Sequence, residues 1–162
     1  MAYNSFNSNN YNKGNNRSNF NNNPKGRDKS DKIDTINMNL QPMTLPDDYI
    51  QKAETIMKEI SRSITTSKIR GFLSLVSKVY NVESVRTEDT LLPESMDTIQ
   101  MMRIRIVYEA GRDTTDGVKR FLEKSNILNY IKSIGNSRQN FISFARYMEA
   151  LVAYHRFYGG KE

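Results

Sequence analysis

The sequence predicts an all-α protein, a compact bundle of about five to six helices that follows a disordered Asn-rich N-terminal tail. Beyond residue 44, apolar side chains recur at steps of three and four residues, which places them on one face of an α-helix. Glycine and hydroxyl or carboxyl side chains stand at the ends of these periodic runs, where helices are commonly capped. Strand signals are nearly absent. The run RIRIVY at residues 103–108 alternates polar and apolar residues as a strand does, but it lies within a longer helical pattern, so we interpret it as helix.

Residues 1–44 are predicted to form a disordered Asn-rich basic leader, and residues 45–162 the helical bundle domain. The leader has few apolar side chains to bury, so it cannot recover the entropy lost on ordering. Its aromatic residues stand among basic residues and could stack on single-stranded bases. A solvated segment without a function is the alternative, and the Asn-rich composition favours it.

The first helix is predicted to begin near Pro46, whose fixed φ suits an opening turn, and to end before Arg62. A second helix begins at residues 64–67 and runs to about Tyr80. Its outer face collects two cations among small residues, which would let a phosphate backbone approach closely. An ordinary solvated helix face is the alternative, and this strip alone favours it. The strip comprises Ser67, Arg70, Gly71, Ser74, Ser77 and Lys78.

A third helix is predicted from Pro93 to Gly111, which would end it as a C-cap. Its buried positions are joined on the flank by Ile104, Val107 and Tyr108. One of its two internal arginines is expected to reach the surface along its aliphatic stem. Thr114 or Thr115 would then cap a short fourth helix, and a fifth would close at Gly135.

The last helix, residues 137–158, is predicted to be the centre of the bundle. Ser137 is a candidate N-cap, and Gly159-Gly160 ends the helix. One face is apolar at helical spacing and includes His155, the single histidine of the chain. A second apolar strip lies opposite, so this helix is expected either to be sandwiched within its own domain or to be covered by another chain. That strip comprises Ile142, Ala150, Ala153 and Phe157.

Composition excludes several classes of function. The chain of 162 residues has no cysteine and one histidine, so it offers no thiolate or His-rich metal site and no cysteine nucleophile. His155 is expected to be a satisfied core residue, and the acids show no spacing typical of a catalytic dyad. The net charge of +6 favours an anionic partner. No apolar run approaches the ~18 residues that a membrane span needs.

Three segments of the sequence closely resemble the small subunit of the type III-A CRISPR effector, the Csm complex. They are ITTSKIRGFLSLVSKVYN at residues 64–81, RIVYEAGRD at residues 105–113 and FARYMEALVAYHRFYGGKE at residues 144–162. The resemblance implies a helical bundle with no enzymatic activity of its own. Several copies would stack in a filament beside the backbone subunits that hold the crRNA. The absence of cysteine fits a cytoplasmic location, and the residue types lead us to expect no cofactor or metal. The leader has no counterpart in the family pattern.

These observations together predict two surfaces. The first would bind the backbone of the crRNA and target RNA through Lys68, Arg70, Lys78, Arg103, Arg105 and Arg112. The second would contact the backbone and large subunits or further copies of the chain, through Ile142, Ala150, Ala153, Tyr154 and Phe157. Two other classes of function stay open. One is a helical adaptor that binds only proteins, and the other is a helix-turn-helix DNA-binding regulator, for which no convincing recognition helix is present.

Overall fold

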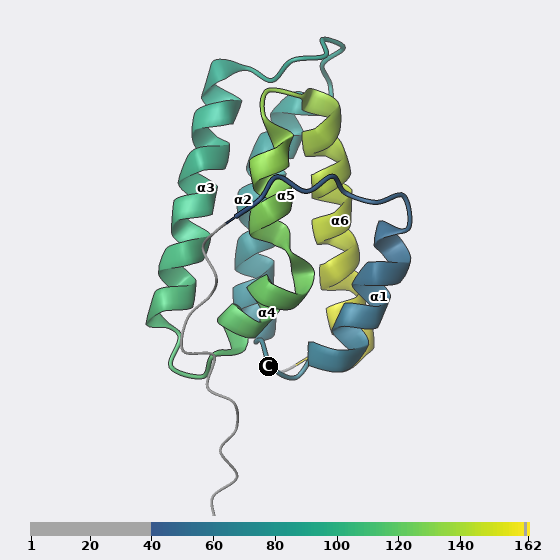
Figure 1. Cartoon of the computed structure of the whole chain (residues 1–162), viewed down its shortest axis with the longest axis vertical. Helices are drawn as coiled ribbons and strands as arrows, with labels where there is room; N and C mark the ends of the chain where they lie inside the picture. The colour runs from purple at the N-terminus through teal and green to yellow at the C-terminus, as the bar shows by residue number, and fades with distance from the viewer. Residues whose placement is uncertain (1–39, 161) are drawn as a thin grey trace, which may run out of the picture. The chain divides into compact units, whose positions relative to one another are not determined.

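The computed structural model describes residues 40–160 and residue 162, which form six α-helices and no strand (Figure 1). The predicted all-α bundle is therefore confirmed for this part of the chain, and residues 1–39 of the predicted leader lie outside it. An isolated antiparallel bridge joins Thr90 to Ser137. The helices are α1 (Tyr49–Ile60), α2 (Thr66–Glu83), α3 (Pro93–Arg112), α4 (Gly117–Ser125), α5 (Ile127–Ile134) and α6 (Arg138–Phe157).

The last helix is central to the packing, as its sequence predicted. α6 packs against α1, α2 and α5 (Figure 1). Its side chains Phe141, Phe144, Met148 and Leu151 are at most 1% exposed, and burial of each such side chain stabilises the fold by about 1.5–3 kcal/mol. α3 packs mainly on α2, with smaller contacts to α4 and α5. One side of α3 is therefore left facing solvent.

The predicted histidine role is confirmed. His155 is 1% exposed, and its Nε2 lies 2.9 Å from the carbonyl oxygen of Ile64. Because a carbonyl oxygen only accepts, Nε2 carries the hydrogen. This bond ties the last turn of α6 to the residue that precedes the cap of α2.

Several predicted helix ends are confirmed. The side chain of Thr65 accepts from the amide of Lys68, and that of Ser137 accepts from the amide of Asn140. Gly135 ends α5 with a φ of +55°, a conformation that other residues rarely adopt.

The turn between α3 and α4 differs from the prediction. Gly111 lies inside the last turn of α3, which ends at Arg112, and its φ is not positive. The cap of α4 comes from Asp113 rather than from a threonine. The carboxylate of Asp113 accepts from the amide of Val118 at 2.7 Å, and the hydroxyl of Thr115 donates to it at 2.9 Å. A carboxylate at this end of a helix is also favoured by the helix dipole.

The packed part of the chain extends beyond the expected boundary at residue 45. Leu40 is 7% exposed, and Lys132 donates to its carbonyl oxygen at 2.6 Å. Ser133 donates to the carbonyl oxygen of Met43 at 2.7 Å. This segment crosses α5 on its way to α1 (Figure 1). Among the described residues, no helix is long and apolar enough to cross a membrane.

Candidate nucleic-acid interface

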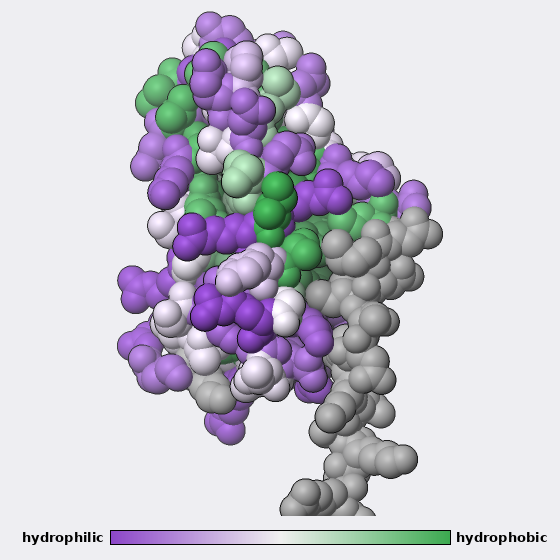
Figure 2. Space-filling view, turned by 90° about the vertical axis from the view of Figure 1, so that its left-hand side faces the viewer, coloured by the Kyte–Doolittle hydropathy of each residue, from purple (hydrophilic) through white to green (hydrophobic). Residues whose placement is uncertain are grey.

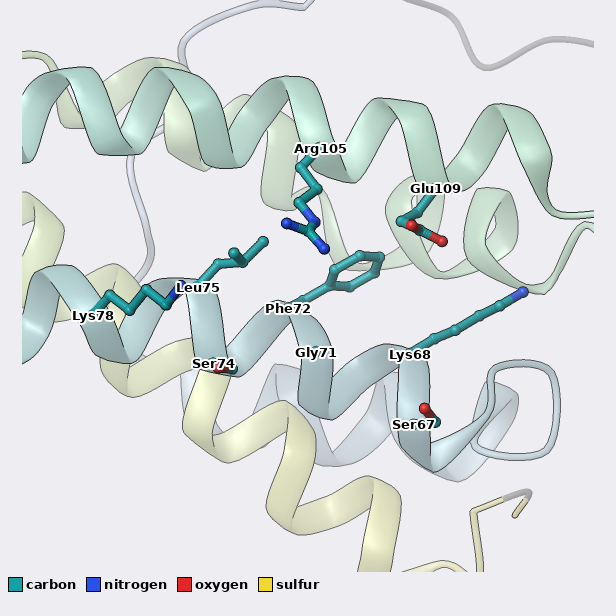
Figure 3. A pocket seen from close by; sticks show the side chains of 9 residues that line it. All are labelled: Ser67, Lys68, Gly71, Phe72, Ser74, Leu75, Lys78, Arg105 and Glu109. Carbon is teal, nitrogen blue, oxygen red and sulfur yellow. The ribbon is translucent and has the colours of Figure 1, made fainter.

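A groove of about 360 Å³ lies between α2 and α3 (Figure 3). Arg105 and Glu109 project into it from α3, while Lys68 and Lys78 extend from α2 at its two ends. Small residues of the predicted α2 strip form the rest of the α2 wall, and apolar side chains form the floor. The lining residues are Ser67, Lys68, Gly71, Phe72, Ser74, Leu75, Lys78, Arg105 and Glu109.

The openness of the α2 wall follows from the sequence. Ser67, Gly71 and Ser74 recur at steps of four and three residues and so share one helix face. Nothing lies within 4 Å of the position where a Cβ of Gly71 would stand. Phe72 is 3% exposed and closes the floor below them. A ligand backbone could thus approach the helix closely at this place.

The groove continues along α3 into a second hollow of about 560 Å³. Leu75, Lys78, Arg105 and Glu109 line both hollows, so the two form one surface. The second hollow adds the outer side of α3 as far as its last residue. Its further lining residues are Thr98, Met101, Met102, Ile104, Tyr108 and Arg112.

The charge of this combined α2–α3 groove is positive. Lys78 and Arg105 are exposed, and neither forms an ion pair with any of the described residues. Arg112 is 3.7 Å from the carboxylate of Glu109, and its guanidinium carbon lies 5.7 Å from the ring centroid of Tyr108. Glu109 is the one acid among the described lining residues. An anionic ligand could contact these unpaired cations without first breaking an ion pair within the chain.

Lys68 has a different environment from the other predicted cations. Its Nζ lies 2.6 Å from Oδ1 of Asp113, whose side chain is 2% exposed. Burial raises the pKa of the Asp113 carboxyl, but hydrogen bonds from Lys68, Val118 and Thr115 lower it by more, so that the net pKa is well below its ordinary value. Lys68 is therefore engaged within the fold, and we leave it out of the candidate site.

Arg70 and Arg103 lie apart from the α2–α3 groove. Arg70 is exposed on α2 but does not line either hollow. Arg103 is half-buried and lines a small hollow of about 120 Å³ with Lys132 and Gly135. It stands two positions before Arg105, about 200° away around the helix. The expectation that one of the two arginines reaches the surface is confirmed, and it is Arg105.

Three residues of the groove were not predicted as surface residues. Met101, Ile104 and Tyr108 are 63%, 59% and 62% exposed. The sequence pattern assigned Ile104 and Tyr108 to the flank of the core. Periodicity alone does not reveal that α3 is covered on one side only, and no other signal in the sequence identifies this exposed ridge.

The predicted subunit interface on α6 is divided by the fold. Ile142 is 7% exposed and belongs to the core of its own chain, so we remove it from the interface. Ala150 and Tyr154 are half-buried, whereas Ala153 is exposed. Phe157 is 77% exposed. The surface open to a partner is thus the C-terminal part of the strip.

Tyr147 of α6 and Tyr158, the residue after this helix, both form hydrogen bonds within the chain. Tyr147 is 1% exposed and donates to the carbonyl oxygen of Ser125 at 2.9 Å. Burial raises the pKa of Tyr147 well above its ordinary value. Tyr158 donates to the carboxylate of Glu54 at 2.9 Å. Packing within the chain accounts for these two side chains.

A metal centre has no basis in the described part of the chain. No group of three or more His, Cys, Asp or Glu residues within it could hold a metal ion. The arrangement of side chains in the groove is one of cations, small residues and apolar surface.

Known proteins are similar in sequence to most of this chain. The family described as Csm2 Type III-A matches residues 44–161. The "CRISPR system Cms protein Csm2" of Streptococcus thermophilus is 38% identical over 122 residues, which cover 72% of this chain and 95% of the relative. The protein of the same name from Mycobacterium tuberculosis is 34% identical over 122 residues, covering 73% and 97%. The chain therefore belongs to the Csm2 Type III-A family, the small subunits of the type III-A CRISPR (Csm) complex.

Proposed function

We propose that this chain is a non-catalytic subunit that binds the backbone of the guide and target RNA through the α2–α3 groove. The observation that carries the proposal is the continuous groove in which Lys78 and Arg105 are exposed and unpaired among the described residues. Phosphate oxygens would be contacted by these cations and by Arg112, and the small side chains of α2 would allow the close approach. Arg70 extends the basic surface beyond the groove.

A contact of this kind reads charge and shape rather than sequence. That property suits a subunit of a guide-containing complex, because base pairing between crRNA and target already selects the sequence. Among its described lining residues, the proposed site has a single carboxylate, that of Glu109, and no histidine. The proposal therefore assigns RNA cleavage to other subunits.

We further propose that several copies of the chain stack within the complex, in the cytoplasm, beside its backbone and large subunits. The C-terminal part of the α6 strip supports this, because Phe157 and Ala153 are apolar and exposed at the end of the bundle. Arg103 stays a proposed RNA contact outside the groove, and Arg146, which is exposed on α6, is proposed to pair with a neighbouring subunit.

RNA binding can be tested with the full chain and a fluorescently labelled RNA of crRNA sequence. We expect the double variant Lys78→Ala/Arg105→Ala to bind more weakly in anisotropy titrations. The slope of log affinity against log salt concentration should become shallower by about two units, because each lost phosphate contact reduces it by roughly one.

The matched control is Lys52→Ala/Lys58→Ala, which removes the same charge from α1. α1 packs against α6 and α4 and does not line the groove. The RNA affinity and the salt slope of this control variant should therefore stay within twofold of the wild-type values. Equal losses of RNA affinity in both double variants would show that the effect comes from the lower net charge and not from the groove. No RNA binding by the wild-type chain even at low salt would favour a protein-only adaptor instead.

A further inference from the structure

The outer side of α3 carries an exposed apolar ridge along the α2–α3 groove. Met101, Ile104 and Tyr108 stand at i, i+3 and i+7, so they form one stripe of the helix. Each is about three-fifths exposed. Figure 2 faces the side of the molecule that includes α3 and shows hydrophobic atoms exposed in the middle of this face and toward its edges, among hydrophilic atoms. A contiguous apolar stripe of this kind inside a basic surface is typical of a site whose ligand has an apolar part.

Three cations line the same hollow as the ridge: Lys78, Arg105 and Arg112. Arg105 and Arg112 lie three residues before and four residues after Tyr108, on the same side of the helix. Arg112 lies over the Tyr108 ring at 5.7 Å from its centroid, yet Tyr108 stays 62% exposed, so ring area remains open. Lys78 faces the ridge across the groove from α2.

We infer that this groove takes RNA with unpaired bases, which stack on Tyr108 and pack on Met101 and Ile104 while their phosphates contact Arg105 and Lys78. The inference rests on the proposed RNA-binding function and specifies its ligand. A fully paired duplex presents phosphates and riboses outward and keeps its base faces stacked inside, so it would leave the ridge uncovered. An unpaired nucleotide offers an anionic phosphate and a flat apolar base together.

Charge decides between RNA and a protein helix as the occupant. Three cations line the hollow around the ridge, against the single carboxylate of Glu109. An anionic polymer with exposed ring faces matches both the charge and the apolar stripe. A protein helix would have to combine an apolar face with several acids at matching positions, and the test below includes that outcome.

The experiment uses the full chain and three oligoribonucleotides of equal length: a single strand, the same strand paired in a duplex, and a single strand with abasic sites at its centre. We expect Tyr108→Ala to bind the single strand about tenfold more weakly, because stacking on an aromatic side chain contributes at that level. Its affinity for the duplex and for the abasic strand should change less than twofold. Tyr108→Phe should bind all three ligands as the wild type does.

Ile50→Ala is the control, since it removes an exposed apolar side chain of α1 that lies outside both the groove and the proposed subunit contact, and it should bind all three ligands as the wild type does. A 2-aminopurine in the single strand should be quenched by the wild type and by Tyr108→Phe, but not by Tyr108→Ala. If Tyr108→Ala weakens binding of all three ligands equally, or does not weaken binding of the single strand, the inference about unpaired bases is wrong. Either result would leave the proposed RNA-binding function standing. Loss of subunit assembly in Tyr108→Ala with unchanged RNA affinity would assign the ridge to a protein partner. No binding of any RNA by the wild type would instead contradict the proposed function itself.

Discussion

Lys68 Nζ lies 2.6 Å from Asp113 Oδ1, and this ion pair joins the first turn of α2 to the turn that begins α4. The same carboxylate accepts from the amide of Val118 and from the hydroxyl of Thr115. One side chain thus caps α4 and fixes its position relative to α2. Asp113 directly follows α3, so the ion pair also joins the end of α3 to the start of α2, the two helices that form the walls of the groove.

The first prediction concerns the stability that this carboxylate supplies. Asp113→Ala removes a helix cap and leaves Lys68 without its partner, so we expect the free energy of unfolding to fall by about 2 kcal/mol. Urea denaturation followed by circular dichroism measures the change. Thr114→Ala is the control in the same turn, because Thr114 is exposed and should change stability by less than about 0.5 kcal/mol. A larger loss in Thr114→Ala would restore the threonine as the cap of α4.

The second prediction is a loss of stability in acid. The folded-state pKa of Asp113 is lowered from the model-compound value of 3.8, because hydrogen bonds to the carboxylate outweigh its burial. The unfolded chain therefore binds a proton at this site before the folded chain does. The stabilisation is complete above the unfolded pKa and is lost as the pH falls below about 4 toward the folded pKa.

Thermal melts of the wild type and Asp113→Asn between neutral pH and pH 2 test this dependence. The melting temperature of the wild type should fall more steeply below pH 4, because the neutral amide has no proton to gain. Glu83 contributes to the acid response of both proteins. Its burial raises the pKa, yet hydrogen bonds from Ser95, Leu92 and Arg86 leave it lowered. Parallel curves for the two proteins would show that Asp113 does not carry the difference.

Local signals account for most of what the sequence predicts correctly. The caps at Thr65 and Ser137 and the glycine at residue 135 depend on neighbours within a few residues, so they can be identified without the fold. The α2 wall of the groove is also predictable, because it is one face of one helix. The α3 wall cannot be predicted in this way, because which side of α3 is exposed depends on the helices that pack against it.

Relationships between distant residues escaped prediction for the same reason. Lys68 and Asp113 are 45 residues apart in sequence, and nothing local indicates that the lysine is paired. Ile142 and Phe157 share one strip by helical projection, yet the fold buries the first at 7% exposure and leaves the second at 77%. Helical period assigns a face to each residue, but only tertiary packing decides how much of that face is covered.

The third prediction tests the exposed end of the α6 strip as a contact between subunits. Phe157→Asp should remain folded, because the residue is 77% exposed and its main ring neighbour is the adjacent Tyr158, with centroids 5.1 Å apart. A carboxylate placed in an apolar interface would be desolvated without a partner, which strongly disfavours association. Co-expression with the other subunits and a crRNA, followed by size-exclusion chromatography, should leave this variant outside the complex. Phe157→Leu keeps an apolar side chain and should be incorporated. Normal incorporation of the aspartate variant would show that the complex does not cover this end of α6, and the contact between copies would then have to use another face.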